Sequence, residues 1–158
     1  MTLKDLIRAN MALSDGLVEA YLGDLSDADL AMRPIEGLNP IAYQLGHLIL
    51  GERMMIDKIK VGNHPALPEG FEALFPKEGA IDSAKYPTKE ILLGLLKAER
   101  ASTLTVLEET PESRFDEETG LPYAPKFGDL FNMVGSHVTM HAGQWVAVRR
   151  KLNKKVAF

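Results

Sequence analysis

Residues 130–152 read LFNMVGSHVTMHAGQWVAVRRKL, and this stretch determines the helical character of the chain. At about 100° per residue, its apolar side chains recur on one side of a helix. That side holds Leu130, Met133, Val134, His137, Val138, His141, Gln144, Trp145, Val148 and Leu152. The other side holds mostly small or polar residues: Asn132, Gly135, Ser136, Thr139, Gly143, Val146 and Arg150. The pattern predicts an amphipathic helix from about residue 127 to about residue 153.

Two histidines lie on the apolar side of this helix. His137 and His141 are four residues apart, so their side chains stand one above the other on the helix surface. A buried imidazole without a partner costs about 1–3 kcal/mol. The inward-facing pair therefore predicts a chelating site that needs a third ligand. The alternative is that both are core histidines satisfied by hydrogen bonds alone.

A third histidine lies in an earlier helical segment, residues 39–60. Asn39 is expected as its N-cap, with Pro40 at the first helical position. The main apolar row of this helix is Ile41, Leu45, Leu48, Ile56 and Ile59, and a second row is Tyr43, His47, Leu50 and Met54. His47 is expected to face inward from the second row. It supplies the third imidazole.

Two further segments, residues 3–25 and 88–109, show the same helical spacing, and no stretch reads as a run of strands. A short extra turn is expected at residues 28–32. We therefore expect an all-α four-helix bundle in which residues 1–158 form a single domain. The link over residues 61–87 contains four prolines and is long enough to let the second and third helices run parallel. Such a link is expected to shape a pocket mouth.

Composition argues against several classes of protein. The net charge of −4 and the pI near 5.6 argue against a nucleic-acid-binding surface. The sequence has no run of 18 apolar residues and no signal-peptide pattern, so the expected location is cytoplasmic, without membrane contact. Because the chain has no cysteine, it offers neither thiolate ligands nor a sulfur nucleophile. Any sulfur chemistry would use a thiol carried by another molecule.

Three imidazoles without a fourth protein ligand are typical of a catalytic metal site with an open position. The expected metal is a divalent transition ion, zinc or nickel in the first place and iron as an alternative. Tyr43, Gln144 and Glu52 are candidates to orient the histidines by accepting a hydrogen bond from the ring nitrogen that does not bind the metal. His64 precedes a proline in the long link and is expected to be exposed, with a role as an extra ligand or as an acid or base at the pocket rim as the alternative.

The motifs around these histidines are similar to those of a known family. NPIAYQLGHL at residues 39–48 resembles the second-helix motif of the DinB-like, or YfiT-like, superfamily. GDL at residues 128–130 and HVTMHAGQW at residues 137–145 resemble its fourth helix. The resemblance implies an up-down-down-up bundle, a metal held by His47, His137 and His141, and frequent homodimers. Tyr43 stands where relatives often carry tryptophan.

Characterised members of that family include metal-dependent transferases and isomerases that use a low-molecular-weight thiol such as bacillithiol, mycothiol or glutathione. The first hypothesis is therefore a metal-dependent S-transferase or thiol-assisted isomerase that acts on small electrophiles. A second hypothesis is a hydrolase that uses metal-bound hydroxide. A third is a non-catalytic bundle that binds metal or a small ligand, and a fourth is a structural dimer with core histidines.

Overall fold

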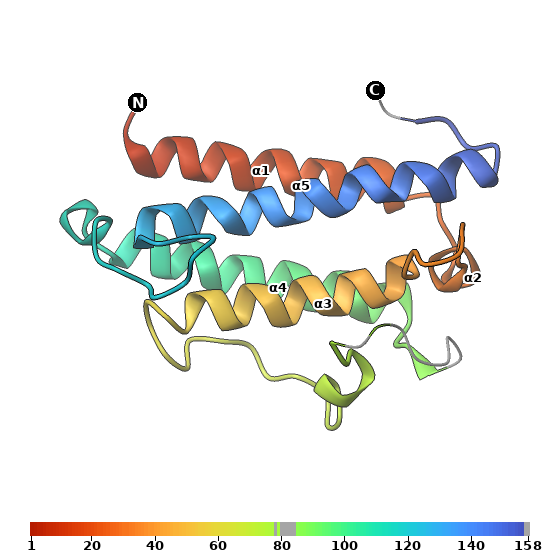
Figure 1. The fold of residues 1–158 in the computed structure, drawn as a ribbon, viewed down its shortest axis with the longest axis horizontal. Helices are drawn as coiled ribbons and strands as arrows, with labels where there is room; N and C mark the ends of the chain where they lie inside the picture. Colours follow the sequence, from red (N-terminus) through yellow and green to blue (C-terminus); the bar gives the residue numbers. More distant parts are fainter. Residues whose placement is uncertain (78, 80–84, 157–158) are drawn as a thin grey trace.

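Helices make up the regular structure of the chain, as the computed structural model shows (Figure 1). The structure describes residues 1–77, 79 and 85–156. Its elements are α1 (Leu3–Leu22), α2 (Asp27–Ala31), α3 (Ile41–Ile56), η1 (Glu72–Leu74), α4 (Lys89–Glu109), η3 (Glu112–Arg114) and α5 (Phe127–Lys151). Within those ranges no strand forms, and one isolated bridge joins Glu118 to Lys126. The predicted all-α class with four main helices is confirmed.

The four long helices lie in two pairs, α1 beside α5 and α3 beside α4 (Figure 1). Contacts along the second pair give its direction. Glu52 pairs with Arg100, and Lys60, which follows α3, pairs with Glu109 at the end of α4. Because both contacts proceed in the same order along the two segments, α3 and α4 run in the same direction. None of the helices in the described ranges is both long enough and apolar enough to span a membrane.

The first residues of α3 differ from the prediction. Pro40, rather than Asn39, is the N-cap residue, with the extended backbone angles φ −55° and ψ 151°. No side chain caps this end. Instead, the Asn39 carbonyl accepts a hydrogen bond from the Gln44 side chain at 2.8 Å. At its other end the helix stops at Ile56 rather than at residue 60, and the chain continues in tight turns.

The other helices follow the sequence pattern more closely. Thr88 caps α4 as expected, because its hydroxyl accepts a hydrogen bond from the Ile91 amide at 3.4 Å. The short turn expected at residues 28–32 is the helix α2. The helices α1 and α5 end at Leu22 and Lys151, two or three residues before the predicted ends.

Burial separates the two rows of α3. The main row is buried at Ile41, Leu45, Leu48 and Ile56. Along the second row, Tyr43 is buried, but His47 is exposed and Met54 is 48% exposed. The expectation that His47 faces the core is therefore wrong. His47 lies about 100° around the helix from Leu48, at the edge of the apolar stripe rather than within it.

One buried charge network ties three helices together. Arg100 on α4 is 4% exposed and donates to both carboxylate oxygens of Glu52 on α3, at 2.9 and 3.1 Å. It also donates to Asp15 at 2.8 Å and to the Ser14 hydroxyl at 3.1 Å, both on α1. Burial raises the pKa of Glu52, and the Arg100 guanidinium opposes that rise. The pair compensates charges that would otherwise be costly inside the bundle.

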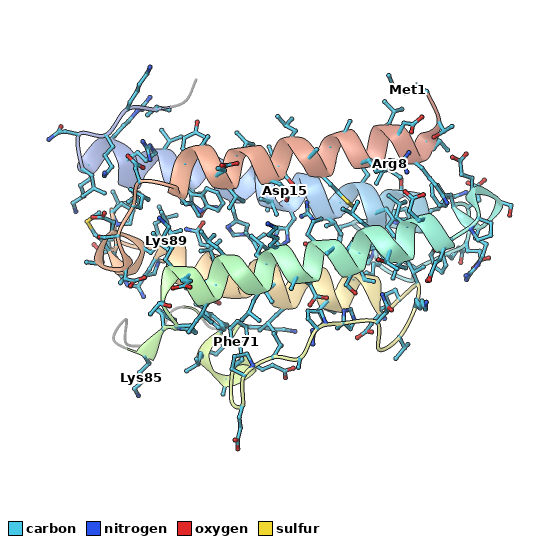
Figure 2. All side chains as sticks on the ribbon, turned by 180° about the vertical axis from the view of Figure 1, so that it is seen from behind. Met1, Arg8, Asp15, Phe71, Lys85 and Lys89 are labelled. Carbon is cyan, nitrogen blue, oxygen red and sulfur yellow. The ribbon has the colours of Figure 1, made fainter. Side chains whose placement is uncertain are left out.

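The long link returns beside α3 and α4, on the side away from α1. Figure 2 shows this segment with Phe71 labelled. Phe71 and Phe75 are both buried, and their ring centroids are 4.8 Å apart. Gly46 permits this packing because a Cβ at that position would overlap the Phe75 ring. The Tyr43 hydroxyl adds a hydrogen bond to the Pro76 carbonyl at 2.5 Å. These contacts fix the link against α3, next to His47.

Candidate metal centre

Three histidines from two helices come together at one point of the bundle. His47 lies on α3, and His137 and His141 lie one turn apart on α5. One ring nitrogen of each lies within 4.8 Å of the other two. The Nε2 atoms of His47 and His137 are 3.2 Å apart. The three residues predicted from the sequence are thus the three that the fold brings together.

Helix direction explains this convergence. Gln44 contacts Trp145, whereas His47, one turn later, contacts His137, so α3 and α5 run in opposite directions. Both rings of the α5 pair lie near His47, with centroids 5.0 Å (His137) and 5.3 Å (His141) from the centroid of its ring. Gly51 lies against the His137 ring, and a Cβ at that position would be in ordinary van der Waals contact with the ring carbon Cε1, at 3.4 Å.

The three imidazoles line the edge of the core and are partly open. His47 is exposed, and His137 and His141 are partly buried. Desolvation of the rings by the surrounding protein lowers the pKa of all three, and repulsion from neighbouring histidines lowers the pKa of His137 and that of His141 further. The pKa of His137 and that of His141 fall to about 4. Near neutral pH the rings are uncharged, which is the form that binds metal ions.

The donor spacing suits a single ion. In tetrahedral geometry, two imidazole nitrogens bound to one zinc ion at about 2.0–2.1 Å lie about 3.3–3.4 Å apart. The His47–His137 separation of 3.2 Å is close to that value. The third ring also fits, since its centroid lies 5.3 Å from that of His47 and 4.9 Å from that of His137. The cluster could therefore hold a metal ion through nitrogen atoms alone.

The expected orienting residues differ from those observed. Glu52 is paired with Arg100 and does not contact the cluster. Tyr43 stacks parallel to the His47 ring, with centroids 6.4 Å apart, while its hydroxyl binds the link. The contact that the sequence interpretation missed is Gln44, whose side-chain oxygen lies 3.0 Å from His141 Nδ1. Its position three residues before His47, on a neighbouring part of the helix surface, was the available signal.

His64 lies away from the cluster and is not the exposed loop residue that was expected. Its side chain is 7% exposed and lies between two carboxylates. Nε2 is 2.8 Å from Asp57, and Nδ1 contacts Glu99, which also pairs with Arg53 at 2.9 Å. Both ring nitrogens are therefore engaged in fixing the start of the link to α3 and α4, and neither is directed to the three-histidine cluster.

A pocket of about 480 Å³ opens beside the cluster. It is lined by His47, His141, Tyr43, Gln44, Gln144, Asn39, Lys77, Gly37 and Leu38. Two of the three imidazoles thus face a space large enough for a small molecule. The amide of Gln144, proposed above as an orienting group, lines this space, and Lys77 at the end of the anchored link segment is its one charged residue among those described.

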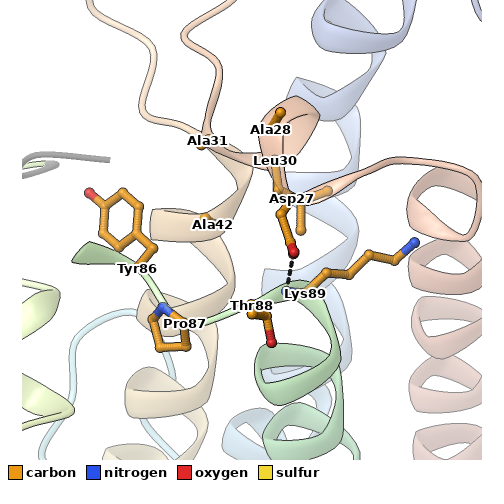
Figure 3. Close-up of a pocket in the computed structure, with 9 residues that line it drawn as sticks. All are labelled: Asp27, Ala28, Leu30, Ala31, Ala42, Tyr86, Pro87, Thr88 and Lys89. Atoms are coloured by element: carbon orange, nitrogen blue, oxygen red, sulfur yellow. Dashed lines mark hydrogen bonds between the residues drawn. The ribbon is translucent and has the colours of Figure 1, made fainter. Parts of the chain in front are cut away.

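A separate pocket of about 330 Å³ lies where α2 meets the start of α4, and no histidine lines it (Figure 3). Asp27 accepts a hydrogen bond from the Lys89 amide at 2.6 Å across this pocket. That bond satisfies one of the free amides at the N-terminus of α4. The contact explains how α2 is fixed to the bundle and concerns stability rather than chemistry.

Comparisons with known proteins identify the family of the chain and a protein of similar fold. A family model described as the DinB superfamily matches residues 14–145. A crystal structure of a conserved protein from Enterococcus faecalis has a similar fold, with a TM-score of 0.70. At 17% identity, the similarity covers 98% of this chain and 99% of that one. No curated protein matches the sequence.

Proposed function

This chain belongs to the DinB superfamily, and from that membership and its cluster of three imidazoles we propose a metal-dependent S-transferase or thiol-assisted isomerase. Its substrates would be small electrophiles. The observation that carries the proposal is the convergence of His47, His137 and His141 beside a pocket. The parallel course of α3 and α4 supports the up-down-down-up order that the family resemblance implies.

In this proposal His47, His137 and His141 hold one divalent transition ion, zinc or nickel in the first place and iron as an alternative. When bound, the ion would supply Lewis acidity that makes a coordinated thiol ionise near neutral pH. The residues contribute neutral nitrogen donors, because desolvation lowers the pKa of each ring. Three protein donors leave at least one position free for a thiol.

The reacting molecules would lie in the pocket beside the cluster. Its wall carries the Gln144 amide and the Tyr43 ring, which can hold a small molecule by hydrogen bonding and by packing. Lys77 adds a positive charge at the end of the link segment that Phe75 and Pro76 fix against α3. The sequence has no cysteine, so the attacking sulfur must belong to a second, exogenous molecule.

The exposure of His47 favours one alternative, in which metal-bound hydroxide hydrolyses a small substrate. Because water reaches this side of the site, it can supply the hydroxide, and hydrolysis would proceed without a thiol. The two functions differ in their response to thiol: added thiol raises turnover in the transferase, whereas in the hydrolase it competes with hydroxide for the ion and does not raise turnover. A bundle that only binds metal or a small ligand would show no turnover with either.

The test is consumption of a model electrophile, 1-chloro-2,4-dinitrobenzene, by zinc- or nickel-loaded protein with glutathione, bacillithiol or mycothiol. We expect thiol-dependent consumption that is lost in His137→Ala. His64→Gln is the matched control, because it changes a histidine outside the cluster, and it should retain activity. Full activity in His137→Ala would remove the metal from the mechanism, and turnover without thiol would favour the hydrolase.

A further inference from the structure

Gln44 is a buried amide in contact with the cluster. Its side chain, on a residue that is 2% exposed, makes three hydrogen-bonding contacts. The oxygen Oε1 lies 3.0 Å from Trp145 Nε1 and 3.0 Å from His141 Nδ1. The nitrogen Nε2 donates to the Asn39 carbonyl at 2.8 Å. Both ends of the amide are therefore fixed by the protein.

The hydrogen-bonding partners of the Gln44 amide determine which of its ends is the oxygen and which is the NH2 group. The indole nitrogen of Trp145 is only a donor, so it requires an oxygen opposite it. The Asn39 carbonyl is only an acceptor, so it requires the NH2 group. Rotating the amide by 180° would oppose two donors at Trp145 and two acceptors at Asn39. The Gln44 oxygen must therefore be the atom that faces His141.

A carboxamide oxygen accepts hydrogen bonds and donates none, so the atom facing it must carry a hydrogen. His141 Nδ1 is consequently the protonated nitrogen of the neutral ring, and Nε2 carries the free lone pair. His47 and His137 differ in this respect, because their Nε2 atoms face each other at 3.2 Å and either one could hold the hydrogen.

We propose that Gln44 is a positioning residue that selects Nε2 of His141 as a metal donor before any ion arrives. The Asn39 carbonyl holds the NH2 end of that amide, so the oxygen faces His141 whether or not Trp145 also donates to it. This inference rests on the proposed metal site, and it adds a tautomer that is set in the metal-free protein. Loss of such orienting partners typically weakens metal binding by about 10–100-fold.

The experiment uses the full chain with three substitutions, Gln44→Leu, Gln44→Glu and Trp145→Phe. In metal-free protein, two-bond ¹H–¹⁵N NMR correlations of the imidazole report which nitrogen of His141 is protonated. Zinc affinity is then measured by competition with a chromophoric chelator. Leucine removes the acceptor, glutamate retains one, and Trp145→Phe removes a buried hydrogen bond while leaving the oxygen opposite His141.

We expect wild type, Gln44→Glu and Trp145→Phe to keep the Nδ1-protonated form of His141. Gln44→Leu should populate the Nε2-protonated form and bind zinc about 10–100-fold more weakly. Trp145→Phe should bind zinc within about threefold of wild type even if it loses stability, which separates positioning from packing. If Gln44→Leu keeps both the tautomer and the affinity of wild type, the proposal is wrong. If wild type binds no zinc but Gln44→Leu changes the tautomer, the metal site fails and the positioning role of Gln44 stands.

Discussion

The Nε2 atoms of His47 and His137 lie 3.2 Å apart, although 90 positions separate the two residues in the sequence. This contact joins α3 to α5 at the open edge of the core. Two neutral imidazoles at this distance share one hydrogen bond or hold one ion, and the third ring beside them favours the ion.

Acid should destabilise the metal-free protein through the cluster. The pKa of His137 and that of His141 are about 4 in the folded state, against 6.5 for the unperturbed side chain. The unfolded chain therefore binds these protons more tightly, so the stability present above pH 6.5 is lost as the pH falls toward 4. We expect a loss on the order of 3 kcal/mol over this range, after a discount for the water at the open side.

The measurement is urea denaturation of metal-free protein between pH 4 and pH 7.5, for wild type and for a His137→Gln, His141→Gln double variant. Other groups titrate in the same range, so the difference between the two curves isolates the cluster. Wild type should lose more stability on acidification than the double variant. Parallel curves would show that these rings titrate normally.

Gly46 should resist substitution because the link packs on it. A Cβ there overlaps the buried Phe75 ring, and overpacking costs about 1–3 kcal/mol, which exceeds the gain of about 1 kcal/mol for Ala over Gly in a helix. Gly94 on α4 is the matched control, because a Cβ there meets nothing within 4 Å. Thermal or urea unfolding should show Gly46→Ala less stable and Gly94→Ala more stable than wild type. A stabilised Gly46→Ala variant would contradict the described packing of the link.

The Glu52–Arg100 pair should behave as a unit. Glu52→Leu leaves the buried guanidinium with Asp15 as its remaining carboxylate and should cost about 3–5 kcal/mol. Replacing both residues, as Glu52→Leu with Arg100→Met, removes both charges and should cost less than the Glu52→Leu change alone. A double-mutant cycle by urea unfolding measures the coupling. Additive losses would show that the two side chains do not depend on each other.

Periodicity and capping predicted most of the helices. Thr88 begins α4 where expected, because a hydroxyl before a helical run can satisfy a free amide. Asn39 has the same capping potential at the next-to-last position before α3, but Pro40 takes the extended N-cap conformation. A helix that begins after Asn39 would have an Asn cap and a proline at its first position, and a helix that begins after Pro40 has the extended proline as its cap. Sequence patterns alone therefore left the start of α3 uncertain by one residue.

The histidines were predicted from spacing, but their surroundings were not. The helical period gives the side of the helix on which a residue lies. It does not say which neighbouring segment packs against that side. On α5, Gly135 was assigned to the outer side, yet it is buried because Asn10 of α1 packs on it. His47 was assigned to the core and lies at its edge. The contact of Gln44 with His141 depends on how α3 and α5 face each other, which no local pattern specifies.

The most direct test is metal content. Wild type, His47→Ala, His141→Ala and the control His64→Gln are loaded with zinc or nickel, dialysed, and analysed by elemental mass spectrometry. The account predicts about one ion per chain in wild type and His64→Gln, and a large loss in the two cluster variants. Wild type without bound metal, or cluster variants with as much metal as wild type, would contradict it.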